Sequence, residues 1–174
     1  MKKIQYLFLS ALAILIFSCS SNNENEFTPV YNGNIDGGDW INSQTIGNYG
    51  GYTGDRCSKV DSVNEYSFGL SKLFNEISAN PVNKIKVSVW VKLSDLNKKS
   101  TLVVSVKGTD NKNLLWSGHD LNPLVKEAGK WTKIEVEDVL TNINTEGAIA
   151  GIYVWNSNKN TVYIDDYKIQ FLPE

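Results

Sequence analysis

The sequence predicts an all-β fold, an antiparallel sandwich or jelly roll, for the part of the chain that follows its first thirty residues. Apolar and polar residues alternate over short runs, which is the pattern of half-buried strands. Turn segments rich in Gly, Asn, Asp and Ser separate these runs. No long segment carries the i, i+3, i+4 apolar pattern of a helix. Many short strands joined by such turns are typical of sandwiches and jelly rolls.

The alternating runs define the expected strands in order. The clearest is 83–93, in which four β-branched residues share one face: Ile85, Val87, Val89 and Val91. The last two runs flank a polar loop and predict a β-hairpin. Residues 121–128 are expected to form one short helical turn. The expected strands are residues 56–60, 66–74, 83–93, 101–107, 114–118, 131–136, 149–155 and 161–171.

The start of the chain has the features of a secretory signal peptide. Lys2 and Lys3 precede an apolar run over 6–17, which is shorter than the roughly 20 residues of a membrane span. The residues that end at Cys19 resemble the lipobox of bacterial lipoproteins, in which the Cys is acylated and begins the mature chain. The alternative is an ordinary signal peptide. We expect three parts, which are a lipoprotein signal peptide at 1–18, a flexible polar tether at 19–30 and a jelly-roll β-sandwich domain at 31–174.

The residues after Cys19 bear on where such an anchor would reside. Ser20 stands where an acidic residue would signal retention in the inner membrane, so the same resemblance implies the bacterial outer membrane. Glu24 and Glu26 resemble the acidic export tag of Bacteroidota surface lipoproteins. We therefore expect a domain that is lipid-anchored through Cys19, on the cell surface or the periplasmic face. Stable anchoring takes more than one acyl chain.

Charge and cysteine content argue against a nucleic-acid-binding protein and against a disulfide-stabilised one. The net charge of the chain is −2, and loss of Lys2 and Lys3 would lower it to −4. Without a dense Lys/Arg stripe, nucleic-acid binding is not expected, because that affinity depends on neutralising phosphates. Once Cys19 is acylated, Cys57 is the only cysteine left, so no intramolecular disulfide is possible. Cys57 is expected to be a small buried hydrophobe.

Three parts of the sequence resemble the galactose-binding-like jelly rolls of carbohydrate-binding modules, especially the group that includes the xylan- and glucan-binding families. They are GYTGDRCSKVDS with EYSFGLSK, KIKVSVWVKLSD, and GKWTKIEVED with TVYIDDYKIQF. The resemblance extends over roughly residues 31–171. It implies a galactose-binding-like jelly-roll fold and a function in binding glycans, although one fold hosts many functions.

Several aromatic residues are candidates for contact with an oligo- or polysaccharide. Sugar rings pack their C–H faces on aromatic rings, while their hydroxyls need polar partners. Trp90 lies opposite the valines of its strand, and Tyr153 and Trp155 alternate away from their apolar neighbours. Trp116 is a further candidate whose face the pattern leaves ambiguous. Asn156 supplies a polar group beside Trp155. The alternatives are core or edge packing for each aromatic residue and turn chemistry for Asn156.

Asp165 is unusual because strand interiors rarely contain Asp. The alternation puts it on the face of Tyr163 and Tyr167, and a buried carboxylate must be paired, hydrogen-bonded or metal-bound. In the resembling jelly rolls the acid of this motif helps to hold a structural Ca²⁺, and Asp36 is a candidate second ligand. Ligation by oxygen alone suits Ca²⁺. The alternative is that backbone N–H groups or Arg56 satisfy Asp165.

Catalysis is not expected. His119 is the only histidine, and neither a nucleophile elbow nor a Gly-rich phosphate loop is present. A glycosidase could use two of the nineteen acidic residues, but the chain has no long insertions to wall a cleft. The sequence therefore favours non-catalytic glycan binding through aromatic stacking on a sheet face. The alternative is a structural or protein-interaction jelly roll of an outer-membrane assembly.

Overall fold

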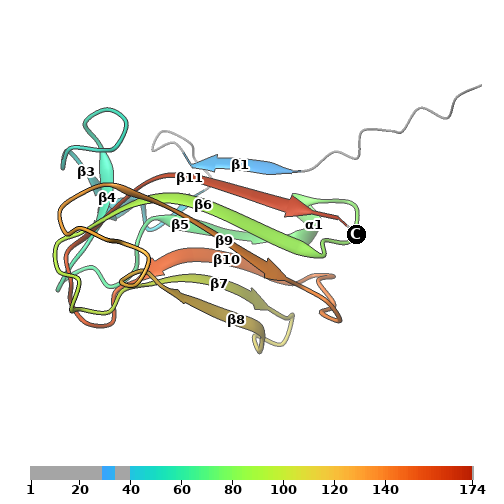
Figure 1. Cartoon of the computed structure of the whole chain (residues 1–174). Helices are drawn as coiled ribbons and strands as arrows, with labels where there is room; N and C mark the ends of the chain where they lie inside the picture. The colour runs from blue at the N-terminus through green and yellow to red at the C-terminus, as the bar shows by residue number, and fades with distance from the viewer. Residues whose placement is uncertain (1–28, 34–39, 174) are drawn as a thin grey trace, which may run out of the picture.

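The computed structural model describes residues 29–33 and 40–173. Two antiparallel sheets pack face to face as a jelly-roll β-sandwich (Figure 1), which confirms the predicted fold class. Cys19 and Asp36, the expected sites of lipidation and calcium ligation, lie outside the described residues. Within the described part of the chain, no helix has the length and apolar content of a membrane span.

Each sheet is assembled from strands that are distant in the sequence. Sheet A has the order β3–β4–β11–β6–β9, and β1 pairs with β11 beyond the end of β4. Its strands are β1 Val30–Gly33, β3 Ile46–Gly47, β4 Cys57–Val60, β6 Lys84–Leu93, β9 Thr132–Val139 and β11 Val162–Leu172. Sheet B has the order β2–β5–β10–β7–β8. Its strands are β2 Trp40–Ile41, β5 Gly69–Leu73, β7 Thr101–Lys107, β8 Asn113–Asp120 and β10 Ile149–Trp155.

Every expected strand overlaps an observed one, and the differences lie at the ends. The expected strand 66–74 is shorter in the structure, because its last residue begins the one-turn helix α1, Phe74–Ile77. In 121–128 the chain makes turns, with the N–H of Val125 donating to the carbonyl of Leu121 at 3.0 Å. The strands β1, β2 and β3 were not expected. They are too short to show an alternating pattern.

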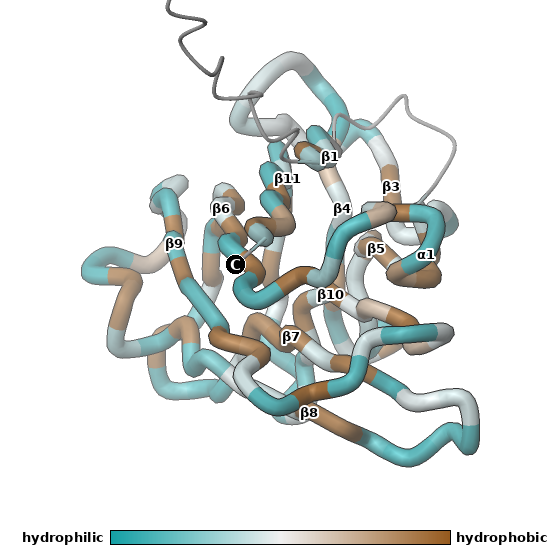
Figure 2. Tube along the Cα trace, turned by 90° about the vertical axis from the view of Figure 1, so that its right-hand side faces the viewer, coloured by the Kyte–Doolittle hydropathy of each residue, from teal (hydrophilic) through white to brown (hydrophobic). Residues whose placement is uncertain are grey.

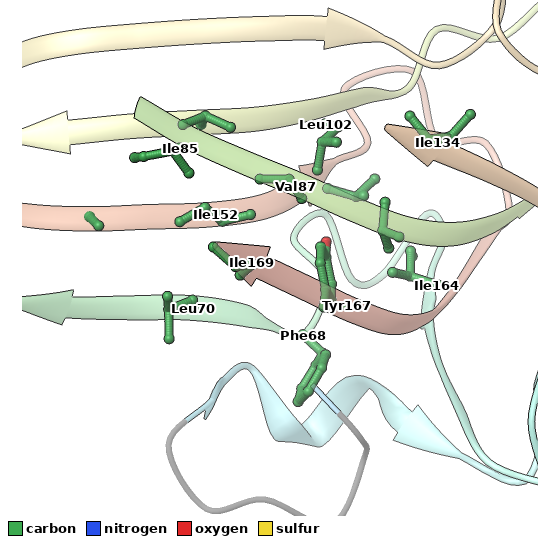
Figure 3. Packing of buried hydrophobic residues seen from close by; sticks show 14 of the residues in the cluster. Phe68, Leu70, Ile85, Val87, Leu102, Ile134, Ile152, Ile164, Tyr167 and Ile169 are labelled. Atoms are coloured by element: carbon green, nitrogen blue, oxygen red, sulfur yellow. The ribbon is translucent and has the colours of Figure 1, made fainter. Parts of the chain in front are cut away.

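The core lies between the sheets. The predicted inward face of β6 is buried over its whole length, and Ile85 and Val87 meet Leu102 and Ile152 of sheet B (Figure 3). Along both sheets apolar residues alternate with hydrophilic ones (Figure 2). Fully burying one such aliphatic side chain contributes about 1.5–3 kcal/mol. The alternation therefore both drives the two sheets together and assigns an inner and an outer face to each strand.

The predicted hairpin of the last two strands is wrong. β10 pairs with β5 and β7 in sheet B, whereas β11 pairs with β4, β6 and β1 in sheet A. The loop between them crosses from one layer to the other (Figure 1). Both strands have an apolar face that needs cover, and placing them in opposite sheets buries Ile152 and Val154 on one side of the core and Ile164 on the other.

Candidate functional site

The outer face of sheet B, which we call the B face, carries ordered rows of side chains across neighbouring strands. Strand pairing places Gly151 of β10 between Ser71 of β5 and Ser105 of β7. Ser105 also pairs with Trp116 of β8, so this row crosses four strands. The next row on the same face contains Tyr153, Val103 and Gly118. The ambiguity over Trp116 is thereby resolved, because its indole lies on the outer face.

Three of the expected ligand-binding residues meet on the B face. The indoles of Trp116 and Trp155 form a T-shaped pair with ring centroids 6.2 Å apart. Tyr153 forms a hydrogen bond with Trp116, and its ring lies edge-on to that of Tyr66 with centroids 5.7 Å apart. Trp116 and Tyr66 are 48% and 46% exposed. We call these four residues the aromatic cluster.

A groove of about 170 Å³ lies beside the aromatic cluster. Gly151 keeps its floor low, because a Cβ at this position would lie 2.6 Å from Ser105 Oγ. Such a volume is below the roughly 300–1,000 Å³ of pockets that enclose a whole small molecule, so the groove fits one part of a longer ligand. The lining residues are Ile41, Ser71, Ser105, Lys107, Ile149, Gly151 and Tyr153.

Polar groups orient the rings of the aromatic cluster and lie beside them. Trp155 Nε1–H donates to Glu65 Oε1 at 2.9 Å, which holds the orientation of the indole. The Ser105 hydroxyl donates to the Gly151 carbonyl at 3.2 Å. Burial raises the pKa of Tyr153 above its ordinary value of 10.0, although its hydrogen bond with Trp116 acts in the opposite direction. The phenol of Tyr153 therefore keeps its proton at neutral pH.

Trp90 does not join the aromatic cluster. It lies on the outer face of sheet A, where strand pairing sets it between Asp165 and Lys133. The ring of Tyr52 stacks on its indole, with centroids 3.6 Å apart and planes inclined by 12°. Trp90 is thus on the opposite side of the sandwich from Trp155, and another residue of the chain covers one face of its ring.

The amide of Asn156 is buried between its own loop and the chain that follows β4. Its side chain is buried, with 1% of its surface exposed. Its Nδ2 donates to the carbonyls of Asp61 and Asn160 at 3.0 and 2.8 Å, and its Oδ1 accepts the N–H of Asn160 at 2.9 Å. Turn chemistry, the alternative for this residue, accounts for the two contacts with Asn160, and the bond to Asp61 ties this loop to the chain that follows β4. Asn156 holds the crossing between the two sheets and does not line the groove.

The expected face of Asp165 needs correction. It lies on the outer face with Trp90, whereas Tyr167 points into the core (Figure 3). The cause is a β-bulge, because the pairing with β6 shifts between Asp165 and Lys168. Asp166 in the bulge has a positive φ of 46°. The extra residue inverts the alternation, which a uniform two-residue period cannot predict.

Backbone donors satisfy the buried carboxylate of Asp165. Its Oδ2 accepts the N–H groups of Tyr52 and Thr53 at 2.7 and 3.2 Å, and its Oδ1 accepts that of Asp166 at 2.9 Å. Burial nevertheless raises the pKa of Asp165. Among the described residues, no group of three or more His, Cys, Asp or Glu side chains could hold a metal ion. These N–H groups satisfy the carboxylate without a metal ion, and Ca²⁺ at Asp165 and Asp36 stays a prediction.

The neighbouring thiol of Cys57 is buried, as expected. Burial, together with the charge of Asp165, raises its pKa to about 11, so the thiol stays protonated at neutral pH.

His119 bridges the open edges of the two sheets. Its Nε2 lies 2.8 Å from Asp138 Oδ2 of β9 and 3.2 Å from Ser117 Oγ. A Ser–His–Asp triad needs the serine and the carboxylate on different ring nitrogens, so that the histidine can pass a proton between them. Here both partners share Nε2. The arrangement therefore ties β8 to β9 and does not activate a nucleophile.

Another hollow, of about 540 Å³, lies at one end of the sandwich between α1 and the loop before β10. Phe74, Asn75, Ile143 and Glu146 are among its lining residues, and none of the sequence-predicted site residues lines it.

The candidate site also includes residues that the sequence reasoning missed. Ser105 and Lys107 could have been found, because they alternate with the buried Val104 and Val106. Tyr66 could not, since its bridge to Trp155 joins two segments that are distant in the sequence.

Comparisons with known proteins give matches in structure only. No family model matches the chain, and neither does any curated protein. The C-terminal family 22 carbohydrate-binding module of Clostridium thermocellum Xyn10B aligns with a TM-score of 0.56 and 12% identity, over 81% of this chain and 91% of that one. The CBM22-1 xylan-binding domain of Paenibacillus barcinonensis Xyn10C aligns with a TM-score of 0.54 and 12% identity, over 83% and 94%.

Two further structures extend the comparison. The CBM22-2 xylan-binding domain of Paenibacillus barcinonensis Xyn10C has a TM-score of 0.51 and 16% identity, over 81% of this chain and 98% of that one. The CBM22-1–GH10 modules of Clostridium thermocellum Xyn10B, complexed with xylohexaose, have a TM-score of 0.51 and 18% identity. In that case 82% of this chain covers only 26% of the longer one. At these identities the likeness concerns the fold, which is the jelly-roll β-sandwich seen in carbohydrate-binding modules.

Proposed function

We propose that this chain is a non-catalytic carbohydrate-binding protein whose glycan lies on the B face. The observation that carries the proposal is that Trp116, Tyr153 and Trp155 meet beside a groove lined by two serines, Ser71 and Ser105. Sugar rings can lay their C–H faces on the indoles, while the groove supplies hydroxyl and backbone partners. Xylan is the first polysaccharide to test, because two modules of the same fold are named as xylan-binding domains.

The groove favours binding over hydrolysis. Among the described residues, those that line it include no carboxylate, whereas most glycosidases place two carboxylates around the scissile bond. The nearby Glu65 holds the indole of Trp155. A groove this shallow buries little surface, so the affinity of one site should be modest.

A lipid anchor at Cys19 would compensate for the modest affinity of a single glycan site. We propose that acylation of Cys19 holds the protein at the bacterial outer membrane, where many copies on one surface bind a polymer with avidity. Replacing Cys19 by Ser should move the protein from the detergent phase to the aqueous phase in a phase-separation assay. Partition of the variant into the detergent phase, as for the wild type, would contradict the anchor.

A second function also has an observation in its favour. Exposed apolar residues gather on the B face, namely Ile41, Tyr66, Leu73, Leu114 and Trp116. Such a patch also suits a protein partner. The two functions differ in what occupies the face, because a sugar needs the groove as well as the rings. Filling the groove with Gly151→Val should abolish glycan binding but leave a flat contact largely intact.

The test is a glycan array probed with the purified full chain, followed by titration calorimetry with any glycan that binds. We expect binding to at least one plant, host or bacterial polysaccharide, and loss of that binding in Trp116→Ala. A wild-type protein that binds none of these glycans would contradict the proposed function.

A further inference from the structure

Lys107 occupies a distinctive position at the end of β7. It belongs to the wall of the groove, together with Ile149, Ser105 and Tyr153. Strand pairing places Lys107 opposite Ile149 on one side and Asn113 on the other, so no acidic residue faces it across either strand. A shift in the pairing of β7 with β8, between Val106 and Lys107, ends the regular register at this residue.

The charge of Lys107 is not neutralised by the surrounding chain. Among the described residues it has no salt-bridge partner, although many other lysines have one. The acid nearest in sequence, Asp110, is engaged by Lys112 at 2.7 Å. On the same face Asp120 pairs with Lys99 at 3.0 Å, and Glu65 accepts the indole N–H of Trp155. The groove therefore contains one cation whose charge is free to meet a ligand.

We infer that the groove selects an acidic glycan, and that Lys107 binds the carboxylate of a uronic acid while the neighbouring sugar rings lie on the aromatic cluster. This inference rests on the proposed function of the B face. The serines of the groove are neutral and can form hydrogen bonds with the hydroxyls of any sugar. Discrimination between acidic and neutral glycans therefore comes from Lys107. An ammonium group acts as a compact point charge and sets no planar geometry, which suits a carboxylate that varies in position along a polymer.

The expected preference for acidic over neutral glycans is modest and sensitive to salt. Lys107 is exposed, and exposed ion pairs give a gain equivalent to about a two- to fivefold change in affinity. The Debye length falls from about 10 Å at 0.1 M salt to about 3 Å at 1 M, so the preference should disappear at high ionic strength. Stacking of sugar rings on the aromatic cluster should persist at high ionic strength.

The experiment compares polymers that differ only in charge. Glucuronoxylan, polygalacturonate and alginate are each tested beside a form whose carboxylates have been reduced to alcohols. Binding is measured at low and high salt for the full-length wild type, for Lys107→Gln and for Lys126→Gln. Lys126 is an exposed lysine outside the groove, so the control loses the same charge elsewhere.

We expect the wild type and Lys126→Gln to bind at least one native polymer two- to fivefold more tightly than its reduced form at low salt. Lys107→Gln should bind both forms equally, with an unchanged melting temperature. Equal binding of native and reduced forms by the wild type would overturn the inference while leaving the proposed function intact, and so would a preference that survives in Lys107→Gln. Failure to bind either form of any of these three polymers, by a protein that binds another glycan on the array, would overturn the inference and leave the proposed function intact.

Discussion

The indole of Trp116 meets the indole of Trp155 edge to face, with ring centroids 6.2 Å apart and planes inclined by 83°. The two residues come from β8 and β10, which are separated by β7 in sheet B. Their rings therefore bridge across an intervening strand and present two differently oriented aromatic surfaces. A glycan that follows the B face can contact both.

Trp116→Ala should weaken glycan binding by about 2 kcal/mol or more, which is about 30-fold, because the indole is a large rigid surface at the centre of the cluster. The melting temperature should change little, since nearly half of the side chain is exposed. Titration calorimetry and thermal unfolding measure the two effects. Tyr49→Ala is the control, because Tyr49 is similarly exposed but lies beside Tyr163 of sheet A. Equal losses in both variants would contradict the location of the site.

Glu65 should act as a positioning residue for Trp155. Glu65→Ala removes the acceptor of the indole N–H and should weaken binding several-fold, in line with the roughly 0.5–1.5 kcal/mol of one hydrogen bond. Glu65→Gln keeps a side-chain oxygen and should retain most of the affinity. If both variants lose affinity equally, glycan binding depends on the charge of Glu65 and not on its hydrogen bond.

Asp165 should make a recognisable contribution to the pH dependence of stability. Its pKa is raised in the folded state, so the folded protein holds this proton more tightly than the unfolded chain does. The contribution of Asp165 to the free energy of unfolding is therefore greatest below its ordinary pKa of 3.8. It is lost as the pH rises through the higher pKa that Asp165 has in the folded protein. The free energy of unfolding of the wild type, measured relative to Asp165→Asn, should fall as pH increases across this window. A relative free energy that rises with pH would show that the N–H donors outweigh burial.

Asn156→Ala should destabilise the protein by about 3 kcal/mol, because it removes three hydrogen bonds and leaves buried backbone groups without partners. Chemical denaturation measures the loss. Asn158→Ala is the matched control, since Asn158 lies exposed in the same loop, and it should be nearly neutral. Similar losses in both variants would indicate that the loop as a whole, and not the buried amide, is sensitive to substitution.

The strands of this fold could be predicted because their alternation is regular. In 83–93 every second residue is apolar, and that pattern alone identifies β6 and its inner face. The partners of each strand could not be predicted in the same way. The polar loop after Trp155 resembles a hairpin turn in sequence, yet Asn156 and Asn160 organise it as a crossing between two sheets.

The candidate site was predictable only in part for the same reason. The outward faces of Tyr153 and Trp155 follow from their own strand. That Trp116 joins them, whereas Trp90 does not, depends on the order of strands in each sheet, and Tyr66 joins them through a bridge to Trp155 outside the strands. The face of Asp165 depends on a single extra residue at Asp166, and no local pattern reveals that bulge.

The most direct test of the B face as the glycan site uses the indole N–H signals of the five tryptophans in a ¹⁵N-labelled protein. Titration with a glycan that binds should shift the signals of Trp116 and Trp155. Those of Trp90 and Trp131, on the outer side of sheet A near Tyr52, should stay in place. Shifts at Trp90 and Trp131 with none at Trp116 and Trp155 would contradict the account and move the binding site to the opposite sheet.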